Sequence, residues 1–298
     1  MKSFGIRVPA SSANIGPGFD SMGLALNLYL TLKVSPSDKW EITQHSPNLP
    51  EQTDYDNHYI IQVARSVAAN WNQELPACSI TIESEIPLAR GLGSSASAIV
   101  AGIELADQAC NLNLTQEQKL EIGTEIEGHP DNVAPALVGG FIISTVVNDD
   151  VDWASLQDPD LEVILYIPGS DLKTEEARSV LPENYTREHA ASASAISNVL
   201  IASLAAGDYS LAGKMMEQDV FHEPYRASMI PNYHDIRREA KQQGAYGTVI
   251  SGAGPTMMSF VPKDKGQMIV AHFQEFLPDY QVVLLQADHT GSSIISNF

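Results

Sequence analysis

The sequence predicts an α+β protein of two lobes, and three observations carry this prediction. The chain has 298 residues, enough for one large domain or two lobes. An acidic stretch without periodicity, 148–160, predicts a boundary, so we expect lobes at 1–155 and 156–298. In the last sixty residues a strand, a helix and a strand follow one another, which is typical of a ferredoxin-like α/β sandwich.

Charge and composition exclude several classes of partner. The chain carries 37 acidic and 17 basic residues, a formal net charge of −20, which repels nucleic acid and anionic membrane surfaces. The first seven residues lack the apolar stretch of a secretory signal, and no run approaches the roughly 18 apolar residues of a membrane span, so we expect a cytoplasmic protein. Its two cysteines, Cys78 and Cys110, have no metal-ligand spacing. A small nucleotide remains compatible with this charge, because a helix N-terminus and a few arginines reverse the potential locally.

The first half of the chain alternates short strands with apolar helices. Residues 11–23 and 46–57 are rich in turn residues and predict loops, and 40–43 is predicted to pair with the strand at 24–34. Thr115, with Gln118 three residues later, predicts the start of a helix that stops at Gly128 and Pro130. Strands are predicted at 6–10, 24–34, 40–43, 79–83 and 138–147, and helices at 57–71, from the serines after Gly93 to Cys110, and from Thr115.

The second half of the chain is predicted to contain both strands and helices, which form the second lobe. A loop after the first strand carries Thr174 and Arg178, and 221–226 is predicted to be an irregular link. A glycine segment at 246–256 leads into a strand that ends near Val261, and the chain closes with a short tail. Further strands are predicted at 161–168 and 281–286, and helices at 186–206, 209–218, 232–243 and 264–276.

A glycine loop between a strand and a helix has the strongest local chemistry. Its glycines permit close backbone approach, and its serines stand where a helix begins, with free N–H groups and the positive end of the helix dipole. The loop therefore fits either a phosphate site or a glycine turn with a serine cap, and it matches neither the Walker nor the dinucleotide pattern. It comprises Pro87, Leu88, Ala89, Arg90, Gly91, Leu92, Gly93, Ser94, Ser95, Ala96 and Ser97.

Three glycine segments in this order resemble the three motifs of the GHMP kinase superfamily. They are 8–20 (VPASSANIGPGFD), 87–97 (PLARGLGSSAS) and 250–256 (ISGAGPT). Within the superfamily, the first segment and HPDNVAPA at 129–136 resemble the homoserine kinases in particular. The resemblance implies a ribosomal-protein-S5-domain-2-like N-terminal lobe, a ferredoxin-like C-terminal lobe and a homodimer. It also implies ATP-dependent phosphorylation of the side-chain hydroxyl of L-homoserine, in threonine biosynthesis.

The same resemblance assigns the nucleotide and its metal. The loop at 87–97 is the expected ATP site, and Ser95 with Glu127 is expected to hold Mg²⁺, which prefers hard oxygen ligands. Without the resemblance, Glu127 could also be a solvated acid at the end of a helix, and Ser94 could be only a helix cap. Asn57 is a candidate for the adenine edge or for the N-cap of its helix.

For the amino-acid substrate, the resemblance assigns a carboxylate clamp and an ammonium partner. Arginine suits a carboxylate because its planar guanidinium binds in a bidentate manner. Without the resemblance, either arginine is equally compatible with a surface ion pair, and His129 with an ordinary turn position. The implied substrate residues are Arg178 and Arg226 for the carboxylate, Asp20 for the ammonium, Asn14 near the hydroxyl, and Thr174 and His129 along the wall.

Two mechanisms are compatible with the residues around the hydroxyl. Asp131 could act as a general base, as an aspartate does in mevalonate-type kinases. Alternatively, Asn132 and Asn14 position the hydroxyl, Arg178 stabilises charge, and no carboxylate base is needed, because a loose phosphoryl-transfer transition state demands little activation. The third motif is expected to pack closely against the loop near Asn14, its alternative being an ordinary turn.

Two other functions share parts of this pattern. A mevalonate-type kinase would keep the glycine loop and metal residues without needing two arginines and an aspartate for an amino acid. A catalytically silent relative would keep the fold alone, which intact Ser95 and Glu127 argue against.

Overall fold

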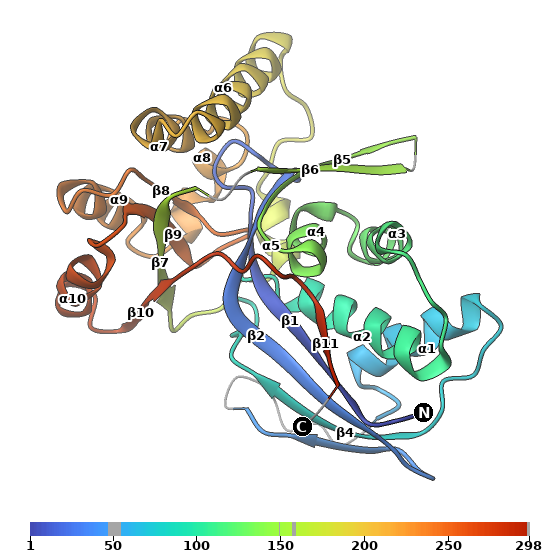
Figure 1. Ribbon diagram of the computed structural model, residues 1–298. Helices are drawn as coiled ribbons and strands as arrows, with labels where there is room; N and C mark the ends of the chain where they lie inside the picture. Colours follow the sequence, from blue (N-terminus) through green and yellow to red (C-terminus); the bar gives the residue numbers. More distant parts are fainter. Residues whose placement is uncertain (47–54, 149, 157–158, 297–298) are drawn as a thin grey trace.

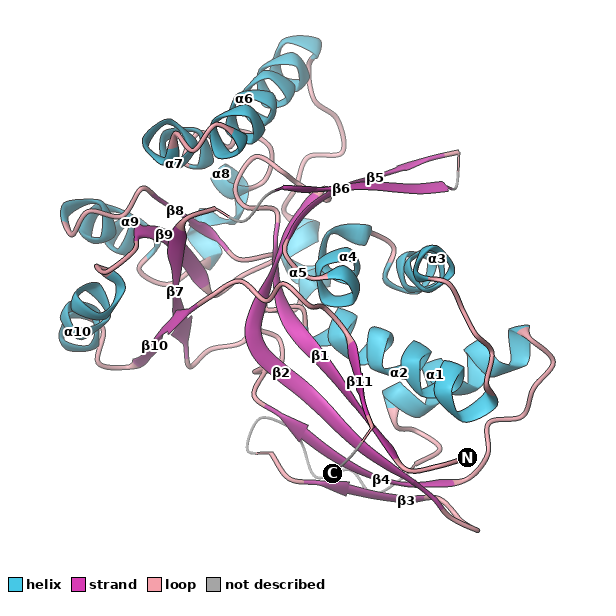
Figure 2. Cartoon of the chain, in the orientation of Figure 1, coloured by secondary structure: helices cyan, strands magenta, loops and turns pink. Residues whose placement is uncertain are grey.

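The computed structural model describes residues 1–46, 55–148, 150–156 and 159–296. Within them, two sheets stand side by side, each with helices against it (Figures 1 and 2). The first has the order β11-β1-β2-β4-β3, with β5 paired to β2 and β6 to β5. Its strands are β1 (Phe4–Ala13), β2 (Met22–Pro36), β3 (Glu41–Gln44), β4 (Cys78–Ser84), β5 (Phe141–Val147), β6 (Asp150–Leu156) and β11 (Ser293–Ile295).

The second sheet has the order β10-β7-β9-β8 and is antiparallel throughout. Its strands are β7 (Leu161–Pro168), β8 (Gly247–Ile250), β9 (Met257–Pro262) and β10 (Tyr280–Leu285). The helices are α1 (Tyr59–Asn70), α2 (Ser94–Cys110), α3 (Gln116–Glu127), α4 (Pro130–Val138), α5 (Thr174–Ser179), α6 (Arg187–Ala205), α7 (Tyr209–Met216), α8 (Glu223–Arg226), α9 (Tyr233–Gln242) and α10 (Gly266–Phe276), with a 3₁₀ turn at Ala227–Met229.

Helix α2 lies at the centre of the first lobe. It packs against α1, α3, α4 and β1, and most of its residues are buried. Its small side chains let the neighbouring helices come close: a Cβ added at Gly102 would lie 2.9 Å from the carbonyl oxygen of Ile60 on α1. This close packing fixes the N-terminus of α2, where the glycine loop ends, against β1.

The predicted architecture of α+β lobes is confirmed, and several elements of the first half differ in detail. The strand predicted at 40–43 corresponds to β3, and it does not pair with β2. Strand β4 lies between β2 and β3, antiparallel to β2 and parallel to β3. Strand β1 extends to Ala13, three residues into the predicted loop. The segment after Gly128 forms helix α4, which was not predicted; Pro130 at its first position suits a helix start.

The second half also contains elements that the pattern did not predict. The predicted acidic boundary contains β6, which forms a hairpin with β5, and Trp153 on it packs against the core. The loop with Thr174 and Arg178 is helix α5, and the irregular link contains α8. The tail forms β11, which pairs with β1. Three-residue strands and four-residue helices are too short to show periodicity. The division at 155 stays a prediction.

Two predictions concern segments at the limits of the described chain. The loop predicted at 46–57 lies largely outside the described residues, as do parts of the predicted boundary, at 149 and 157–158. Among the helices of the described ranges, none has the length and hydropathy of a membrane span.

Candidate active site

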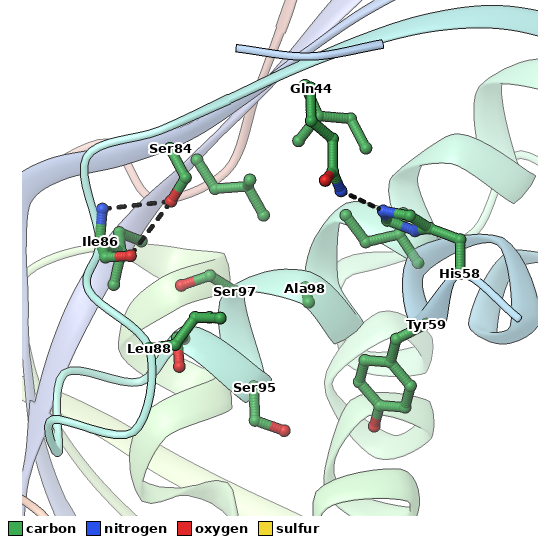
Figure 3. Close-up of a pocket in the computed structure, with 13 residues that line it drawn as sticks. Gln44, His58, Tyr59, Ser84, Ile86, Leu88, Ser95, Ser97 and Ala98 are labelled. Carbon is green, nitrogen blue, oxygen red and sulfur yellow. Dashed lines mark hydrogen bonds between the residues drawn. The ribbon is translucent and has the colours of Figure 1, made fainter. Parts of the chain in front are cut away.

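Two cavities meet at the start of α2. The first has a volume of about 320 Å³ and, among the described residues, no acid, lysine or arginine in its lining. This lining combines aliphatic side chains of β2, α1, β4, the glycine loop and α2 with serines, Gln44, His58 and Tyr59, and we call it the apolar cavity (Figure 3). The second, about 290 Å³, is lined by both predicted arginines and several acidic side chains, and we call it the charged cavity. Ser94 and Ser95 line both. A ligand with one end in each cavity would pass the N-terminus of α2.

The glycine loop is held against the other two motifs. Gly91 and Gly93 have φ angles of 71° and 65°, in the left-handed region. A Cβ at Gly91 would lie 2.1 Å from the Ser251 carbonyl oxygen, and one at Gly93 would lie 2.1 Å from Ser11 Oγ. Only glycine fits at either position. The N-cap of α2 is Gly93, with no side-chain cap, so the interpretation of Ser94 as a cap is wrong.

The loop residues divide between the two cavities. Leu88 and Ser97 line the apolar cavity, and Ala89, Gly91, Leu92 and Gly93 the charged one. Pro87, Arg90 and Ala96 line neither, and Ala96 is buried. Arg90 instead donates from Nη2 to the Gly169 carbonyl, at 2.7 Å, and from Nε to that of Pro168, at 3.1 Å. It therefore ties the loop to the end of β7.

The start of α1 supplies the wall of the apolar cavity. Its N-cap is His58, so Asn57 precedes the cap and does not occupy it. Asn57 is not among the lining residues, whereas the neighbouring His58 and Tyr59 are. Figure 3 shows the hydrogen bond between His58 and Gln44 at one wall of the cavity, with Ser95 at the start of α2. The hydrogen bond joins Gln44 Nε2 and His58 Nε2 at 2.9 Å. Polar groups therefore stand beside aliphatic ones in this cavity.

Ser95 and Glu127 form a pair at the junction of the cavities. Glu127 is the last residue of α3, and its Oε2 accepts a 2.9 Å hydrogen bond from Ser95 Oγ. Burial raises the pKa of Glu127, against the Ser95 hydrogen bond, which lowers it. A carboxylate and a hydroxyl beside a phosphate site are donors that suit Mg²⁺, and the ion's charge would offset the cost of burying the carboxylate.

Arg178 and Asp20 form an ion pair in the charged cavity. Arg178 Nη2 lies 2.6 Å from Asp20 Oδ1, and Nη1 lies 3.2 Å from Oδ2, a bidentate pair. Helix α5 carries the arginine and begins at Thr174, which also lines the cavity. The predicted carboxylate clamp and ammonium partner are therefore brought together, although α5 was predicted as a loop.

Arg226, the second predicted clamp residue, is buried at the end of α8 and lines the same cavity. Its side chain is 1% exposed. Burial, helped by the nearby charge of Arg178, lowers the pKa of Arg226 to about 10. Both guanidinium groups lie 5.4 Å from the centre of the Phe19 ring. The cavity thus holds two cations close to one aromatic ring.

The start of α4 brings three more polar side chains to the charged cavity, beside Glu127. His129 is the N-cap residue of α4, and its Nδ1 hydrogen-bonds to Asp131 Oδ1. Burial disfavours protonation of His129, but the hydrogen bond and charge of Asp131 outweigh it and raise the pKa of the imidazole. Asn132 Oδ1 accepts from Ser11 Oγ at 2.8 Å. Asp131, Asn132, His129 and Glu127 all line the cavity.

The third motif packs against the first two. Ser251 Oγ hydrogen-bonds to Ser12 Oγ and to the Gly91 carbonyl, at 2.8 and 2.7 Å. Gly252 accepts a 2.9 Å hydrogen bond from Asn14 Nδ2 at its carbonyl oxygen, while Asn14 Oδ1 accepts from the Asp20 amide at 3.0 Å. The predicted close packing near Asn14 is confirmed. Asn14 lines the cavity, with both ends of its amide engaged by the protein.

Sequence reasoning missed several residues of the two cavities. Phe19 lines the charged cavity near both arginines, and Gln44, His58 and Tyr59 line the apolar cavity. His222, fully buried, hydrogen-bonds to Arg226 at 3.1 Å. Phe19 lies within the first motif, so its position was a usable signal. The others come from segments whose contacts are distant in sequence, and no local pattern marks them.

The chain is similar to known kinases in both halves. Residues 58–140 match the family model of the GHMP kinases N terminal domain, and 200–279 that of the GHMP kinases C terminal. The chain is 53% identical to the homoserine kinase of Oceanobacillus iheyensis over 99% of both chains. It is 44% identical to that of Bacillus licheniformis, over 97% of this chain and 94% of the relative.

The chain belongs to the homoserine kinase family of GHMP kinases. A crystal structure of homoserine kinase from Cytophaga hutchinsonii agrees, with a TM-score of 0.86 and 27% identity, covering 99% of this chain and 98% of that one. The predicted family and its two-lobed GHMP kinase fold are thereby confirmed.

Proposed function

We propose that this member of the homoserine kinase family transfers the γ-phosphoryl group of ATP to the side-chain hydroxyl of L-homoserine, giving O-phospho-L-homoserine for threonine biosynthesis. One observation carries the proposal: a cavity with two arginines and an aspartate opens beside an uncapped helix N-terminus on a glycine loop. The first pattern suits an amino-acid zwitterion and the second a phosphate.

The nucleotide spans the junction of the cavities. Its base and ribose fit the apolar cavity, where Leu30, Ile60 and Leu88 supply aliphatic contacts. The phosphates lie on the first turn of α2, where free N–H groups and the helix dipole favour negative charge. Ser95 and Glu127 would hold Mg²⁺, which neutralises phosphate charge when bound.

Homoserine binds by replacing an existing ion pair. Arg178 and Asp20 neutralise each other in the structure. The substrate's carboxylate takes the arginine, with Arg226 beside it, and its ammonium takes the aspartate, so that each charge exchanges one partner for another. Thr174 and His129 close the wall of this site. A singly charged alcohol supplies one half of this exchange, and a neutral alcohol supplies neither.

Transfer proceeds without a carboxylate base. Asp131 Oδ1 already accepts from His129 and faces Asn132 Nδ2 at 3.5 Å, so this carboxylate is engaged with its neighbours. Asn14 and Asn132 position the hydroxyl oxygen, which bonds to the γ-phosphorus as the bond to the β–γ bridging oxygen breaks. The hydroxyl proton passes to phosphate or water. A loose transition state depends mainly on positioning and charge stabilisation.

A coupled assay of ADP release tests reaction and acceptor together. The purified protein is given MgATP with homoserine, serine, threonine or mevalonate. We expect rapid turnover with homoserine and far slower turnover with the other three. Preference for mevalonate would favour a mevalonate-type kinase, and no turnover with any acceptor would indicate a catalytically silent relative. Sedimentation of the same sample tests the homodimer, which stays a prediction.

A further inference from the structure

Three acceptors inside the protein hold the guanidinium of Arg226. Its Nε donates to the Ala177 carbonyl at 3.0 Å, and its Nη1 donates to the Gly252 carbonyl at 3.2 Å and to His222 Nδ1 at 3.1 Å. Within the described residues, Nη2 makes no such bond, and Arg226 lines the charged cavity. Two N–H donors are therefore available to a ligand there.

The hydrogen bond with Arg226 defines the protonation of His222. A guanidinium has only donors, so His222 Nδ1 must be the acceptor and carry no proton. Its Nε2 then carries the hydrogen and donates to the Gly16 carbonyl at 2.9 Å. Burial lowers the pKa of His222, which keeps the ring neutral. The imidazole thus links the first motif to the arginine in a single tautomer.

The surroundings of His222 fix its ring. Asp219 Oδ2 lies 3.6 Å from His222 Nε2, and the same carboxylate accepts backbone N–H bonds from Phe221, His222 and Glu223. The Phe19 ring lies 5.3 Å from the imidazole. The ring is therefore held from its own backbone and from the first motif, 206 residues away in sequence.

We propose that His222 is a positioning residue for carboxylate recognition: as a neutral acceptor it fixes Nη1 of Arg226, so that Nη2 is presented to the carboxylate of the substrate. The inference rests on the proposed function, since it takes an amino acid as the ligand of Arg226. Without this acceptor the guanidinium is free to rotate about its last bonds, and binding of a carboxylate must then order it.

Two substitutions separate the two ring nitrogens. In His222→Asn the amide oxygen occupies the place of Nδ1 and still accepts from Arg226. In His222→Gln the amide nitrogen occupies the place of Nε2 and can still donate to Gly16, but the acceptor for Arg226 is lost. His189→Asn is the matched control, because His189 Nε2 hydrogen-bonds to the nearby Val220 carbonyl and, among the described residues, makes no contact with Arg226.

Binding of homoserine to each variant, measured by calorimetry in the presence of a non-hydrolysable ATP analogue, decides the proposal. We expect His222→Gln to weaken homoserine binding about 10-fold, the effect of losing one hydrogen bond to a charged group. His222→Asn should retain binding within about 3-fold of wild type, because the acceptor is kept. Binding of the ATP analogue should not change, which also shows that the variants are folded.

A ligand without the carboxylate, 3-aminopropan-1-ol, gives the second readout. If His222 acts through Arg226, this amino alcohol binds all variants and the wild type equally. Equal weakening of homoserine by the Asn and Gln variants, or weakening of 3-aminopropan-1-ol as well, would show that His222 supports packing only and would overturn the proposal. Failure of the proposed function is seen separately, as wild-type protein that binds homoserine without releasing ADP.

Discussion

The two cavities of this member of the homoserine kinase family solve different recognition problems. The apolar cavity is built from aliphatic and uncharged polar side chains of the first lobe, on β2, β3, β4, α1, α2 and the glycine loop. The charged cavity draws on distant segments: the first motif, the α3–α4 turn, α5, α8 and the third motif. A flat base needs shape and burial, whereas a zwitterion needs charges in fixed positions, which only several separately anchored elements supply.

The difference also appears in how charge is compensated. In the charged cavity, Asp20 pairs with Arg178, Asp131 with His129, and Arg226 donates to two carbonyls and His222. Unpaired buried charge is costly, and in the structure opposite charges pair at Asp20 and Arg178 while neutral acceptors hold Arg226. Under the proposed function, the substrate exchanges partners with the ion pair of Arg178 and Asp20. Predictions that separate the two cavities test this account.

The largest effect is expected at the junction. Glu127→Gln removes the carboxylate beside Ser95 and should lower kcat about 10²- to 10³-fold, because charge on the transferring phosphoryl group is then less well compensated. Asp131→Asn should lower kcat less, since no carboxylate base is required. Steady-state kinetics with MgATP measure both, with exposed Glu125→Gln on the same helix as control. A larger fall in kcat for Asp131→Asn than for Glu127→Gln would contradict this order.

The next effect should be confined to the charged cavity. Arg178→Lys keeps the charge but loses the bidentate geometry, so KM for homoserine should rise about 10- to 100-fold. KM for ATP should stay within about 2-fold, because Arg178 lies outside the apolar cavity. Initial-rate measurements at varied concentrations of each substrate check this, with exposed Arg187→Lys as control. An equal rise in both KM values would contradict the separation of the cavities.

The converse change addresses the apolar cavity. Leu88 is 41% exposed and lines this cavity, so Leu88→Glu replaces a contact with the base by a charge near the phosphates without disturbing the core. KM for ATP should rise about 10-fold, because the nucleotide would no longer bury this aliphatic side chain on binding. KM for homoserine should not change. Val146→Glu, exposed on the β5–β6 hairpin, is the control, and a rise in the homoserine KM alone would reverse our assignment.

The smallest effect on activity is expected for a change at Glu223, on the same helix, α8, as Arg226. Glu223 is buried, accepts from Tyr233 Oη and from the Ile250 amide, and burial raises its pKa to about 7. The unfolded chain loses this proton near pH 4.5, so the wild type should lose stability as pH rises from 4.5 to 7.

Glu223→Gln should remove this loss. By the linkage of proton binding to folding, the variant should gain about 3 kcal/mol relative to wild type over that interval, as an upper value. Urea unfolding at several pH values measures the difference, with exposed Glu188→Gln as control. Parallel pH dependences for the variant and the wild type would contradict a raised pKa at Glu223.

Local chemistry made the glycine loop and α2 predictable. Strand, glycines and small residues follow one another there, and Thr115 forms the predicted capping box with Gln118. Arg178 and Asp20 were predicted as site residues through the family resemblance, and the structure pairs them.

What escaped prediction depends on distance in sequence or on brevity. The pairing of β11 with β1 joins the two ends of the chain, and α5 and α8 are too short for periodicity. The contact of His222 with Gly16 spans 206 positions. Such contacts arise only once tertiary packing has brought the segments together, so no window of sequence contains their signal.

The assignment of one ligand to each cavity is tested most directly by a crystal structure with L-homoserine and a non-hydrolysable ATP analogue. We predict the base among Leu30, Ile60 and Leu88, and the homoserine carboxylate on Arg178 and Arg226. The hydroxyl oxygen should lie about 3 to 3.5 Å from the γ-phosphorus, near Ser95. A nucleotide base in the charged cavity, or a homoserine carboxylate away from both arginines, would contradict the account.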